Sequence, residues 1–520
     1  MKNSIQFKNY IYIIVALCGV IISSCRSKPD PPDKEPETNT KQTPTTDRRE
    51  LTNDSLFLYA KEVYYWNEDL PTYDEFEPRK YRSELDILDN YNQNLFNIVR
   101  SSNSPDYDAM SEDTKYSYIF DQSDKNPTAS IAPHKSAVDL EGHGNDIGIR
   151  FGYYGSNSKY KILVTAVYPD SPADDAGFVR GDEISTINGV AYGSNFAAQI
   201  DDIITAVDGE TVVLAGKRGE TPFSTTLNKS LYTSDPVYKS TVMSAGSKKI
   251  GYLSYARFSD MNNSMNALNA AFDDFASKGV TDLIIDLRYN GGGYINTAIH
   301  LTNLIAPSGT SGVMFAEHYN ATMRNKKATI LKNQPNVNSN GDIVGSYFDG
   351  DYSVAANTET FRKTGPLGNV KNVVFIVTSS TASSSELVIN SLKPYMTVKL
   401  VGEKTYGKPI GFFPITIENK YDVYYAMFET KNSRGEGGYY NGMNVDVSAD
   451  ELTSNDKMYD WGNPNDPSTA KAINILAPGA TVTGKAKTAT AKTAAAGPAL
   501  KKLGGEKTNP EFIGMIENRK

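Results

Sequence analysis

Three stretches of the sequence repeat one plan, in which an apolar run is followed by a turn and an amphipathic helix. "KIGYLSYARFSD" precedes the helical pattern "NSMNALNAAFDDFASKG". "TDLIIDLRYNGGGYINTAIHLTNLIAP" holds a strand, a glycine loop and a helix, and "NVVFIVTSSTASSSELVINSLKPY" repeats this form. Strands that alternate with helices predict a mixed α/β domain. We place this domain at residues 236–477.

Residues 142–232 instead alternate with a period of two, as in "NDIGIRFGYY" and "YKILVTAVYPDSPADDAGFVRGDEISTINGVAY". The pattern predicts strands separated by Gly, Asp and Pro turns, and therefore a small β-domain. The part from Val167 to Val190 resembles a PDZ domain of the protease-associated type, with an unrelated β-domain as the alternative. The resemblance implies that a peptide C-terminus adds as a strand beside a carboxylate-binding loop at Ile147, Gly148 and Ile149.

Residues 48–135 show two helical patterns and predict a small N-terminal helical domain. In the first pattern, Asp54 and Ser55 can cap a helix that places Leu56, Ala60, Val63 and Tyr64 on one stripe. The second pattern places Leu85, Leu88, Tyr91 and Leu95 together. Nothing in this region suggests chemistry.

The first 25 residues resemble a bacterial lipoprotein signal. Lys2 and Lys8 precede the apolar run "YIYIIVALCGVII", which is short for a membrane span but fits a signal-peptide core. The run ends in "IISSC", which resembles a lipobox and implies that Cys25 is lipidated; the alternative is an ordinary secretory signal cleaved near Ser24. We therefore expect a bacterial envelope protein, lipid-anchored in the periplasm or at the outer membrane.

Two further segments are compositionally biased. Residues 26–47 are rich in Pro, Thr and charge, and predict an extended tether. Residues 478–520 are of low complexity and predict a flexible tail. Only Cys18 accompanies Cys25, and it lies inside the signal segment, so the mature chain has no disulfide, Cys nucleophile or Cys-ligated metal.

Composition and histidine spacing exclude several classes of function. The 520 residues suffice for about three domains, and the net charge of −8 argues against a nucleic-acid partner. None of the four histidines (His134, His143, His300 and His318) lies in a metal-ligand spacing, and no G-x-S-x-G elbow is present. We expect neither a metal or other cofactor nor an ordinary Ser–His–Asp enzyme.

A serine run lies where an apolar strand ends and a helix begins. Ser383, Ser384 and Ser385 precede Glu386 in the first turn of this helix. The free N–H groups and the dipole at a helix start favour a developing anion, as an oxyanion hole requires. Simple helix capping is the alternative. The glycine loop of "DLRYNGGG" follows a second apolar strand and could approach a reacting carbonyl, or equally hold a phosphate.

Lys408 lies in "GEKTYGKPIG", which fits the start of a phosphate-binding loop until Pro409 replaces the required Ser or Thr. The following "PIGFFPITI" contains two prolines and predicts a strand instead of a helix. ATP binding through this loop is therefore disfavoured. Apolar neighbours, namely Val401, Ile410, Phe412 and Phe413, would tune Lys408 towards a pKa of roughly 7–8, which suits a general base.

Together these motifs resemble the C-terminal processing peptidases, or tail-specific proteases, over residues 142–475. The resemblance implies an α+β multidomain fold: an N-terminal helical domain, a PDZ-like β-domain and a mixed α/β, ClpP/crotonase-like Ser–Lys peptidase domain. It implies Ser383 as nucleophile, Lys408 as base, and the backbone N–H groups of Ser384 and Gly292 as oxyanion donors. Ser384 stands where Ala is usual, while Phe412 and Pro394 stand where some members have a third catalytic residue.

The resulting interpretation is a lipid-anchored serine endopeptidase that cuts unfolded or C-terminal segments of envelope proteins. Its partners are protein or peptide substrates and, through the anchor, a membrane. The alternative is a catalytically inactive relative that acts as a PDZ peptide-binding lipoprotein, because the third residue is missing at both usual positions.

Overall fold

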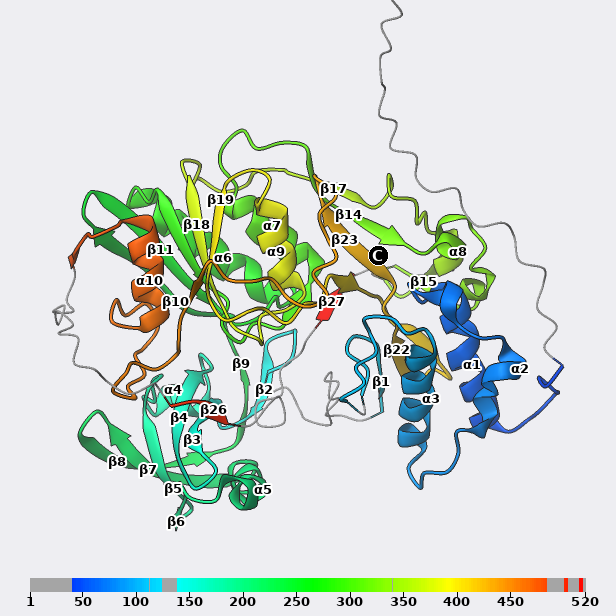
Figure 1. Cartoon of the computed structure of the whole chain (residues 1–520), viewed down its shortest axis with the longest axis horizontal. Helices are drawn as coiled ribbons and strands as arrows, with labels where there is room; N and C mark the ends of the chain where they lie inside the picture. Colours follow the sequence, from blue (N-terminus) through cyan, green and yellow to red (C-terminus); the bar gives the residue numbers. More distant parts are fainter. Residues whose placement is uncertain are drawn as a thin grey trace, which may run out of the picture. The chain divides into compact units, whose positions relative to one another are not determined.

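The computed structural model describes residues 40–111, 113–123, 138–338, 340–483, 500–503 and 514–517. Its main sheet has seven strands in the order β24-β19-β18-β12-β11-β10-β25 (Figure 1). The run from β11 to β24 is parallel, and β10 is antiparallel to both of its neighbours. The strands are β10 (Val237–Ala245), β11 (Lys248–Tyr255), β12 (Asp282–Asp286), β18 (Asn372–Val377), β19 (Thr397–Gly402), β24 (Val447–Ser448) and β25 (Val482–Thr483).

Helices cover both faces of this sheet (Figure 1). Leu283 and Ile285 of β12 belong to the buried cluster that includes α6 (Met261–Ser277), α7 (Ile295–Ile305) and α9 (Ser384–Leu392). Ile284, between them, belongs to the second cluster with α10 (Pro467–Leu476). Successive side chains of a strand point to opposite faces, so both faces require apolar residues. The predicted mixed α/β domain is confirmed.

The sheet brings the three sequence motifs to one edge. β12, β18 and β19 are parallel neighbours, so their carboxyl ends lie side by side. The glycine loop follows β12, α9 follows β18, and the loop that leads to Lys408 follows β19. Carboxyl edges of parallel sheets commonly form ligand sites.

A second sheet forms the predicted PDZ-like β-domain, which is confirmed. Its order is β26-β3-β4-β5-β7-β8, with β6 paired to β5 and every pairing antiparallel. The elements are β3 (Ile149–Ser156), β4 (Lys159–Val167), α4 (Pro172–Asp175), β5 (Glu183–Ile187), β6 (Val190–Ala191), α5 (Phe196–Val207), β7 (Thr211–Arg218), β8 (Thr221–Asn228) and β26 (Lys502–Leu503).

Smaller sheets complete the described chain. They are β1-β22-β21, β17-β14-β23-β20, β15-β16, β2-β9 and β13-β27. Their strands are β1 (Tyr118–Asp121), β2 (His143–Asp146), β9 (Ser230–Thr233), β13 (Gly292–Tyr294), β14 (Val313–Tyr319), β15 (Pro335–Val337), β16 (Ile343–Ser346), β17 (Thr358–Thr360), β20 (Ile410–Gly411), β21 (Ile415–Ile417), β22 (Tyr421–Tyr424), β23 (Phe428–Asn432) and β27 (Gly514–Ile516). The short helix α8 spans Ala321–Arg324.

The first helix begins earlier than predicted. α1 (Arg48–Val63) is capped by Asp47, whose side chain accepts from the Arg49 N–H at 2.9 Å. Asp54 therefore lies inside the helix, and the predicted start at Asp54 and Ser55 is wrong. The Asp54 carboxylate accepts instead from Tyr73 Oη at 2.6 Å and from Arg79 Nη2 at 2.6 Å. A polar residue suited to a cap is here used in a tertiary ion pair.

The second helical pattern also starts later than its apolar residues suggest. α3 (Ile87–Ser101) begins after Asp86, which caps it, and Leu85 is fully exposed before the helix. α2 (Tyr73–Phe76) is a single turn. The buried side chains of α1 and α3 belong to the same cluster as those of α7, α9 and β18, so these helices share a core with the α/β domain.

Three pieces of the predicted flexible tail are strands, β25, β26 and β27, so that prediction is wrong for these residues. The predicted signal segment with Cys25, most of the predicted tether, and His134 lie outside the described residues. Among the helices in the described ranges, none is long and apolar enough to cross a membrane.

Candidate active site

Ser383 lies at the junction of the β18 turn and α9 in a strained backbone conformation. Its φ of 58° and ψ of −112° fall where non-glycine residues are rare, and its side chain is fully buried. No described residue hydrogen-bonds to Ser383 Oγ. Backbone strain of this kind costs about 1–3 kcal/mol and persists only where the surroundings impose it. The hydroxyl is therefore held at this turn without a hydrogen-bond partner among the described residues.

Glu386 joins the serine turn to the lysine loop. One carboxylate oxygen, Oε2, accepts from the backbone N–H groups of Ser383 at 2.9 Å and Lys408 at 2.8 Å. The other, Oε1, accepts from Gly407 N at 2.9 Å and Thr405 Oγ1 at 2.5 Å. The two predicted catalytic residues thus share one acceptor atom. The sequence placed Glu386 in the first helical turn but did not reveal this role.

Lys408 is fully buried among apolar and aromatic groups. Its Nζ donates to the backbone carbonyl of Tyr116 at 3.3 Å and lies 4.5 Å from the centre of the Phe412 ring. The predicted apolar neighbours, namely Val401, Ile410, Phe412 and Phe413, are all fully buried as well. Lys408 therefore occupies the kind of environment that was predicted for it.

Burial lowers the pKa of Lys408 from 10.5 to about 7, although the Asp106 charge opposes this shift. At about 1.4 kcal/mol per unit, the ammonium form is disfavoured by roughly 5 kcal/mol relative to water. A substantial fraction of Lys408 is consequently neutral at neutral pH. Only the neutral amine can accept a proton.

The N-terminal region contributes to this lysine site, which the sequence did not indicate. Tyr116 donates its hydroxyl to the Gly407 carbonyl at 2.8 Å, while its own carbonyl receives Lys408 Nζ. Asp106 is fully buried and accepts from the Tyr116 N–H at 2.6 Å. Burial raises the pKa of Asp106. No local motif marks these residues, since they meet Lys408 only through the fold.

The glycine loop approaches the nucleophile closely. Gly292 has a φ of 111°, and a Cβ added to it would lie 3.0 Å from Ser383 Cβ and 3.1 Å from Ser384 N. Only glycine fits this position. The Gly292 N–H donates to Asn290 Oδ1 at 3.0 Å, so this predicted oxyanion donor is engaged within its own turn.

The serine run fastens α9 to the glycine loop. Ser384 Oγ donates to the Gly293 carbonyl at 2.7 Å, and Ser385 Oγ donates to the Asn290 carbonyl at 3.0 Å. Ser384 therefore uses its hydroxyl for positioning, where alanine could not. Its backbone N–H lies at the first position of α9, which has no carbonyl partner within the helix.

A buried ion network fixes the start of the loop. Arg288 donates to Asp286 Oδ2 at 2.6 Å and to Asp466 Oδ2 at 3.1 Å, and Tyr252 Oη adds a 2.7 Å bond to Asp286. All four residues are buried. Removing one member of such a network leaves an unpaired buried charge, which costs about 3–5 kcal/mol.

The structure brings Ile147, Gly148 and Ile149 together at the entry to β3. Ile147 belongs to the buried PDZ cluster, and Gly148 has a φ of 79°. The Gly148 N–H donates to Asp146 Oδ1 at 2.7 Å. The amide at the centre of the predicted carboxylate-binding loop is thus satisfied by a side chain of its own turn.

Arg180 of the PDZ-like domain contacts the glycine loop of the α/β domain. Its Nη1 donates to Tyr289 Oη at 2.8 Å, and its guanidinium lies 4.5 Å from the Trp461 ring centre. Tyr289 immediately precedes Asn290 and has a φ of 69°. The PDZ-like domain is therefore in direct contact with the segment that shapes the candidate oxyanion site.

Three histidines, His143, His300 and His318, lie within the described residues. His300 Nε2 pairs with Asn269 Oδ1 at 2.9 Å, and burial lowers the pKa of both His300 and His318. His143 is exposed beside Asp139. No group of three His, Cys, Asp or Glu side chains in the described ranges could hold a metal ion.

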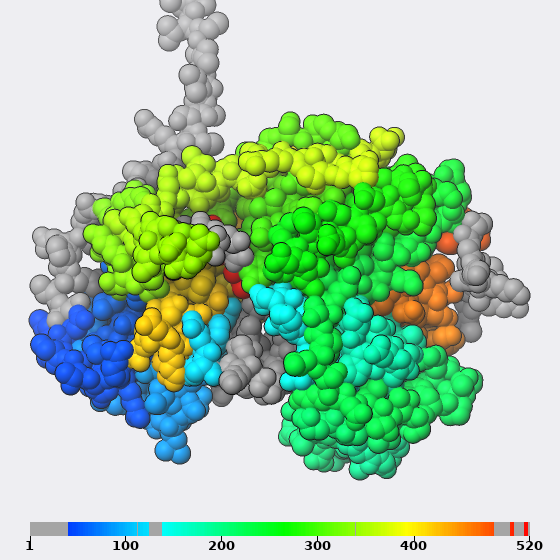
Figure 2. Space-filling model, turned by 180° about the vertical axis from the view of Figure 1, so that it is seen from behind, coloured from blue at the N-terminus to red at the C-terminus, as the bar shows by residue number. Residues whose placement is uncertain are grey.

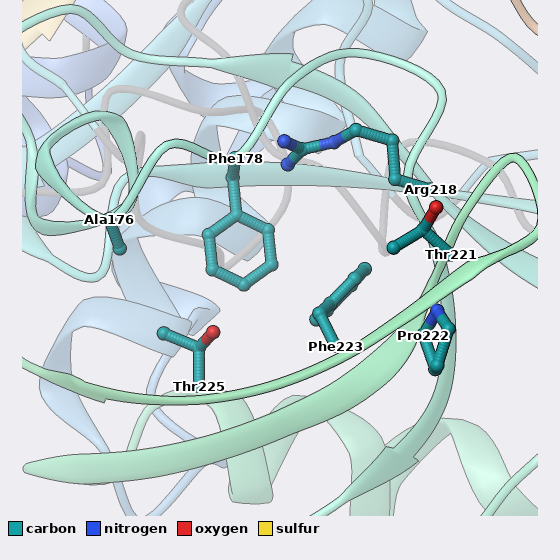
Figure 3. Close-up of a pocket in the computed structure, with 7 residues that line it drawn as sticks. All are labelled: Ala176, Phe178, Arg218, Thr221, Pro222, Phe223 and Thr225. Carbon is teal, nitrogen blue, oxygen red and sulfur yellow. The ribbon is translucent and has the colours of Figure 1, made fainter.

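A hollow of about 270 Å³ in the PDZ-like domain is separate from both candidate sites. Figure 3 shows Phe178 and Phe223 facing it, with Arg218 above. None of the residues that line it belongs to β3 or to the predicted carboxylate loop. It therefore does not coincide with the expected peptide edge.

Comparison with known proteins supports the predicted peptidase and PDZ-like domains. Residues 249–448 match the family model of peptidase family S41, and residues 163–195 match a PDZ domain. The chain is 24% identical over 274 residues to the chloroplastic C-terminal processing peptidase of Tetradesmus obliquus, a match that covers 50% of this chain and 51% of that protein. It is also 24% identical over 276 residues to the carboxyl-terminal-processing protease of Synechocystis sp., covering 52% and 54%.

The chain spans about half the length of these curated relatives. Among solved structures, one from Bacteroides fragilis assigned to the S41 proteases has a TM-score of 0.58 and 21% identity, and the match covers 85% of this chain and 99% of that one. This likeness confirms the fold. The two domain matches and the relatives support the similarity to the C-terminal processing peptidases that the ordered motifs predicted.

Proposed function

We propose that this protein is a serine endopeptidase in which Ser383 is the nucleophile and Lys408 the general base. One observation carries the proposal. Ser383 has a strained backbone and a hydroxyl with no hydrogen-bond partner among the described residues, and Lys408 is buried with its pKa lowered to about 7. The backbone N–H groups of both residues donate to the same oxygen of Glu386. Covalent catalysis requires a nucleophile and a base that is neutral at working pH, and these two residues supply both, with their backbones held to one carboxylate.

In the first half-reaction, Ser383 Oγ bonds to the substrate carbonyl carbon while its proton passes to Lys408 Nζ. The carbonyl π electrons move to oxygen, and the Ser384 N–H donates to the resulting oxyanion. The Gly292 N–H could join only after its bond to Asn290 Oδ1 breaks. The oxyanion then collapses, the C–N bond breaks, and the Lys408 ammonium returns the proton to the leaving amine.

In the second half-reaction, water attacks the acyl ester on Ser383. Lys408 accepts a proton from this water and returns it to Ser383 Oγ as the ester bond breaks. Each proton taken by Lys408 is given back, so no cofactor is needed for balance. The Tyr116 carbonyl accepts from Nζ and so orients the amine.

A serine-reactive fluorophosphonate probe tests the proposal. It should label the wild-type chain at Ser383, and Ser383→Ala should abolish both labelling and hydrolysis of an unstructured peptide. A folded wild-type chain that neither labels nor hydrolyses would favour the alternative, an inactive peptide-binding relative.

For substrates and location, we propose unfolded or C-terminal segments of envelope proteins, cut by a lipoprotein anchored through Cys25. The PDZ-like domain and the relatives named as C-terminal processing enzymes support this substrate class. The lipobox-like "IISSC" supports the anchor. Cys25→Ser should leave the precursor unprocessed or release the protein from membranes; an unchanged palmitate-labelled membrane protein would contradict the anchor.

A further inference from the structure

The strand β27 lies in a slot beside the candidate active site. It pairs in parallel with β13, with Gly514 opposite Gly292 and Met515 opposite Gly293. On its other side, the Phe412 N–H donates to the Met515 carbonyl at 3.1 Å, and the Glu517 N–H donates to the Phe412 carbonyl at 3.0 Å. The segment is thus bonded through its main chain on both edges.

The position of β27 brings it close to the reacting groups. The Gly514 carbonyl oxygen touches the side of Gly292 where a side chain would be, the same side that faces Ser383 Cβ. Met515 is fully buried. Phe412, which holds the other edge, also packs on Lys408 Nζ. Figure 1 shows β27 beside α9, and red atoms from this end of the chain are visible in a recess near the middle of Figure 2.

The strand β26 occupies the free edge of the PDZ-like sheet. Lys502 and Leu503 pair antiparallel with Tyr154 and Tyr153 of β3, and the Gly155 N–H donates to the Lys501 carbonyl at 2.8 Å. Leu503 packs against the same buried cluster as Phe196 and Ile200 of α5. β3 is the strand that follows the predicted carboxylate loop, so β26 uses the edge where a peptide ligand would add.

We propose that the pieces 500–503 and 514–517 are an internal ligand that occupies, within the same chain, both strand-binding edges that a polypeptide substrate needs. This proposal rests on the proposed peptidase function for the role of the slot. Main-chain bonds on both edges and the burial of Met515 favour occupancy. Because these residues belong to the same chain, they compete with a substrate as an intramolecular ligand. A substrate must therefore displace it.

The test uses the full chain and an unstructured, internally quenched peptide substrate. Met515→Lys places a charge at the buried position of Met515 and should weaken the binding of β27 beside β13. Because only this competition is removed, KM should fall about tenfold while kcat stays within twofold. Met515→Leu should behave as wild type. The matched control Met265→Lys makes the same change at a half-exposed position of α6 and should leave KM unchanged. An unchanged or raised KM in folded Met515→Lys protein would overturn the proposal.

Two further measurements separate this proposal from the peptidase assignment. In a Ser383→Ala background, a fluorescent peptide that copies residues 511–520 should bind Met515→Lys protein at least tenfold more tightly than Met265→Lys protein. This measurement needs no catalysis. If the peptide binds both variants equally, residues 514–517 are not an internal ligand, even where the protein hydrolyses peptides. Intact mass should stay unchanged on incubation of the wild type; cleavage at 514–517 would show that the segment is a substrate instead of a competitor.

Discussion

Two glycine turns in this molecule share a hydrogen-bond pattern but differ in charge. In the PDZ-like domain, the Gly148 N–H donates to Asp146 Oδ1 at 2.7 Å; in the α/β domain, the Gly292 N–H donates to Asn290 Oδ1 at 3.0 Å. Both glycines have positive φ, at 79° and 111°. Each turn leads into a strand whose free edge is paired with a piece of segment 500–517.

The difference lies in what each turn offers an anion. Asn290 is neutral, fully buried and held by a 2.9 Å bond from its Nδ2 to the Tyr255 carbonyl. An oxyanion near Gly292 therefore meets no full negative charge from its own turn. Asp146 carries a carboxyl that accepts from Tyr232 Oη at 2.7 Å, and burial raises its pKa. When ionised, it repels a second carboxylate near Gly148. We therefore expect the Asn290 turn to serve the proposed chemistry and the Asp146 turn to bind peptides in a charge-sensitive way.

The largest expected effect is at the base that serves the Asn290 turn. Lys408→Arg should lower kcat/KM by at least about a thousandfold, since arginine does not deprotonate in proteins. Lys404→Arg, at an exposed position of the same loop, is the matched control and should retain activity. Substantial activity of Lys408→Arg would refute the Ser–Lys assignment.

The same base sets the pH dependence. Activity requires neutral Lys408, so kcat/KM should rise from acid pH through an apparent pKa of about 7 and then level off. Asp106 and Glu386 favour the ammonium form, whereas Lys115 opposes it. Asp106→Asn should therefore lower the pKa of Lys408 and move the rise in kcat/KM to lower pH. Replacement of the four histidines should leave this rise in kcat/KM unchanged. If the rise disappears in a folded variant, a histidine and not Lys408 is responsible for it.

A smaller loss of activity is expected when the Asn290 turn is given a carboxylate like that of the Asp146 turn. Asn290→Asp places a carboxylate beside the developing oxyanion and removes the donor to the Tyr255 carbonyl. Loss of one oxyanion contact typically costs about 100-fold or more in kcat, and we expect a loss of about that size. Asn296→Asp, at an exposed position of α7, controls for the added charge. Full activity of folded Asn290→Asp protein would show that the turn's neutrality is unimportant.

The parts of the site that the sequence predicted are contiguous motifs at strand ends. Ser383, Lys408 and the glycine loop follow β18, β19 and β12, and parallel neighbours bring their carboxyl ends together. The apolar setting of Lys408 was also visible in part, because its chain neighbour Phe412 packs on Nζ.

The rest depends on contacts between distant residues. Tyr116 reaches Lys408 across 292 positions, and no local pattern marks a backbone carbonyl as a partner. The strands β26 and β27 were missed because they are short and lie in a compositionally biased region, and their pairing comes from edges of other sheets. The helix start at Arg48 was missed because Asp54 suits a cap but is used by Arg79.

The smallest expected effects are at the PDZ turn, where binding alone is at stake. If this loop receives a terminal carboxylate, amidating the C-terminus of a substrate should slow its cleavage by a few-fold, while a small ester substrate is barely affected. Equal turnover of the free-acid and amidated peptides would contradict recognition of a C-terminus by Gly148 and its neighbours.

The charge at Asp146 sharpens this test. Asp146→Asn makes the PDZ turn resemble the Asn290 turn, so the free-acid peptide should bind about two- to fivefold more tightly, as expected for the loss of a partly solvated like charge. The amidated peptide should bind unchanged, because it carries no carboxylate to repel. Asp175→Asn, at an exposed position of α4, is the matched control and should alter neither. An equal gain for both peptides would mean that the mutation reshapes the turn, and the contrast in charge between the two glycine turns would then not govern what each of them binds.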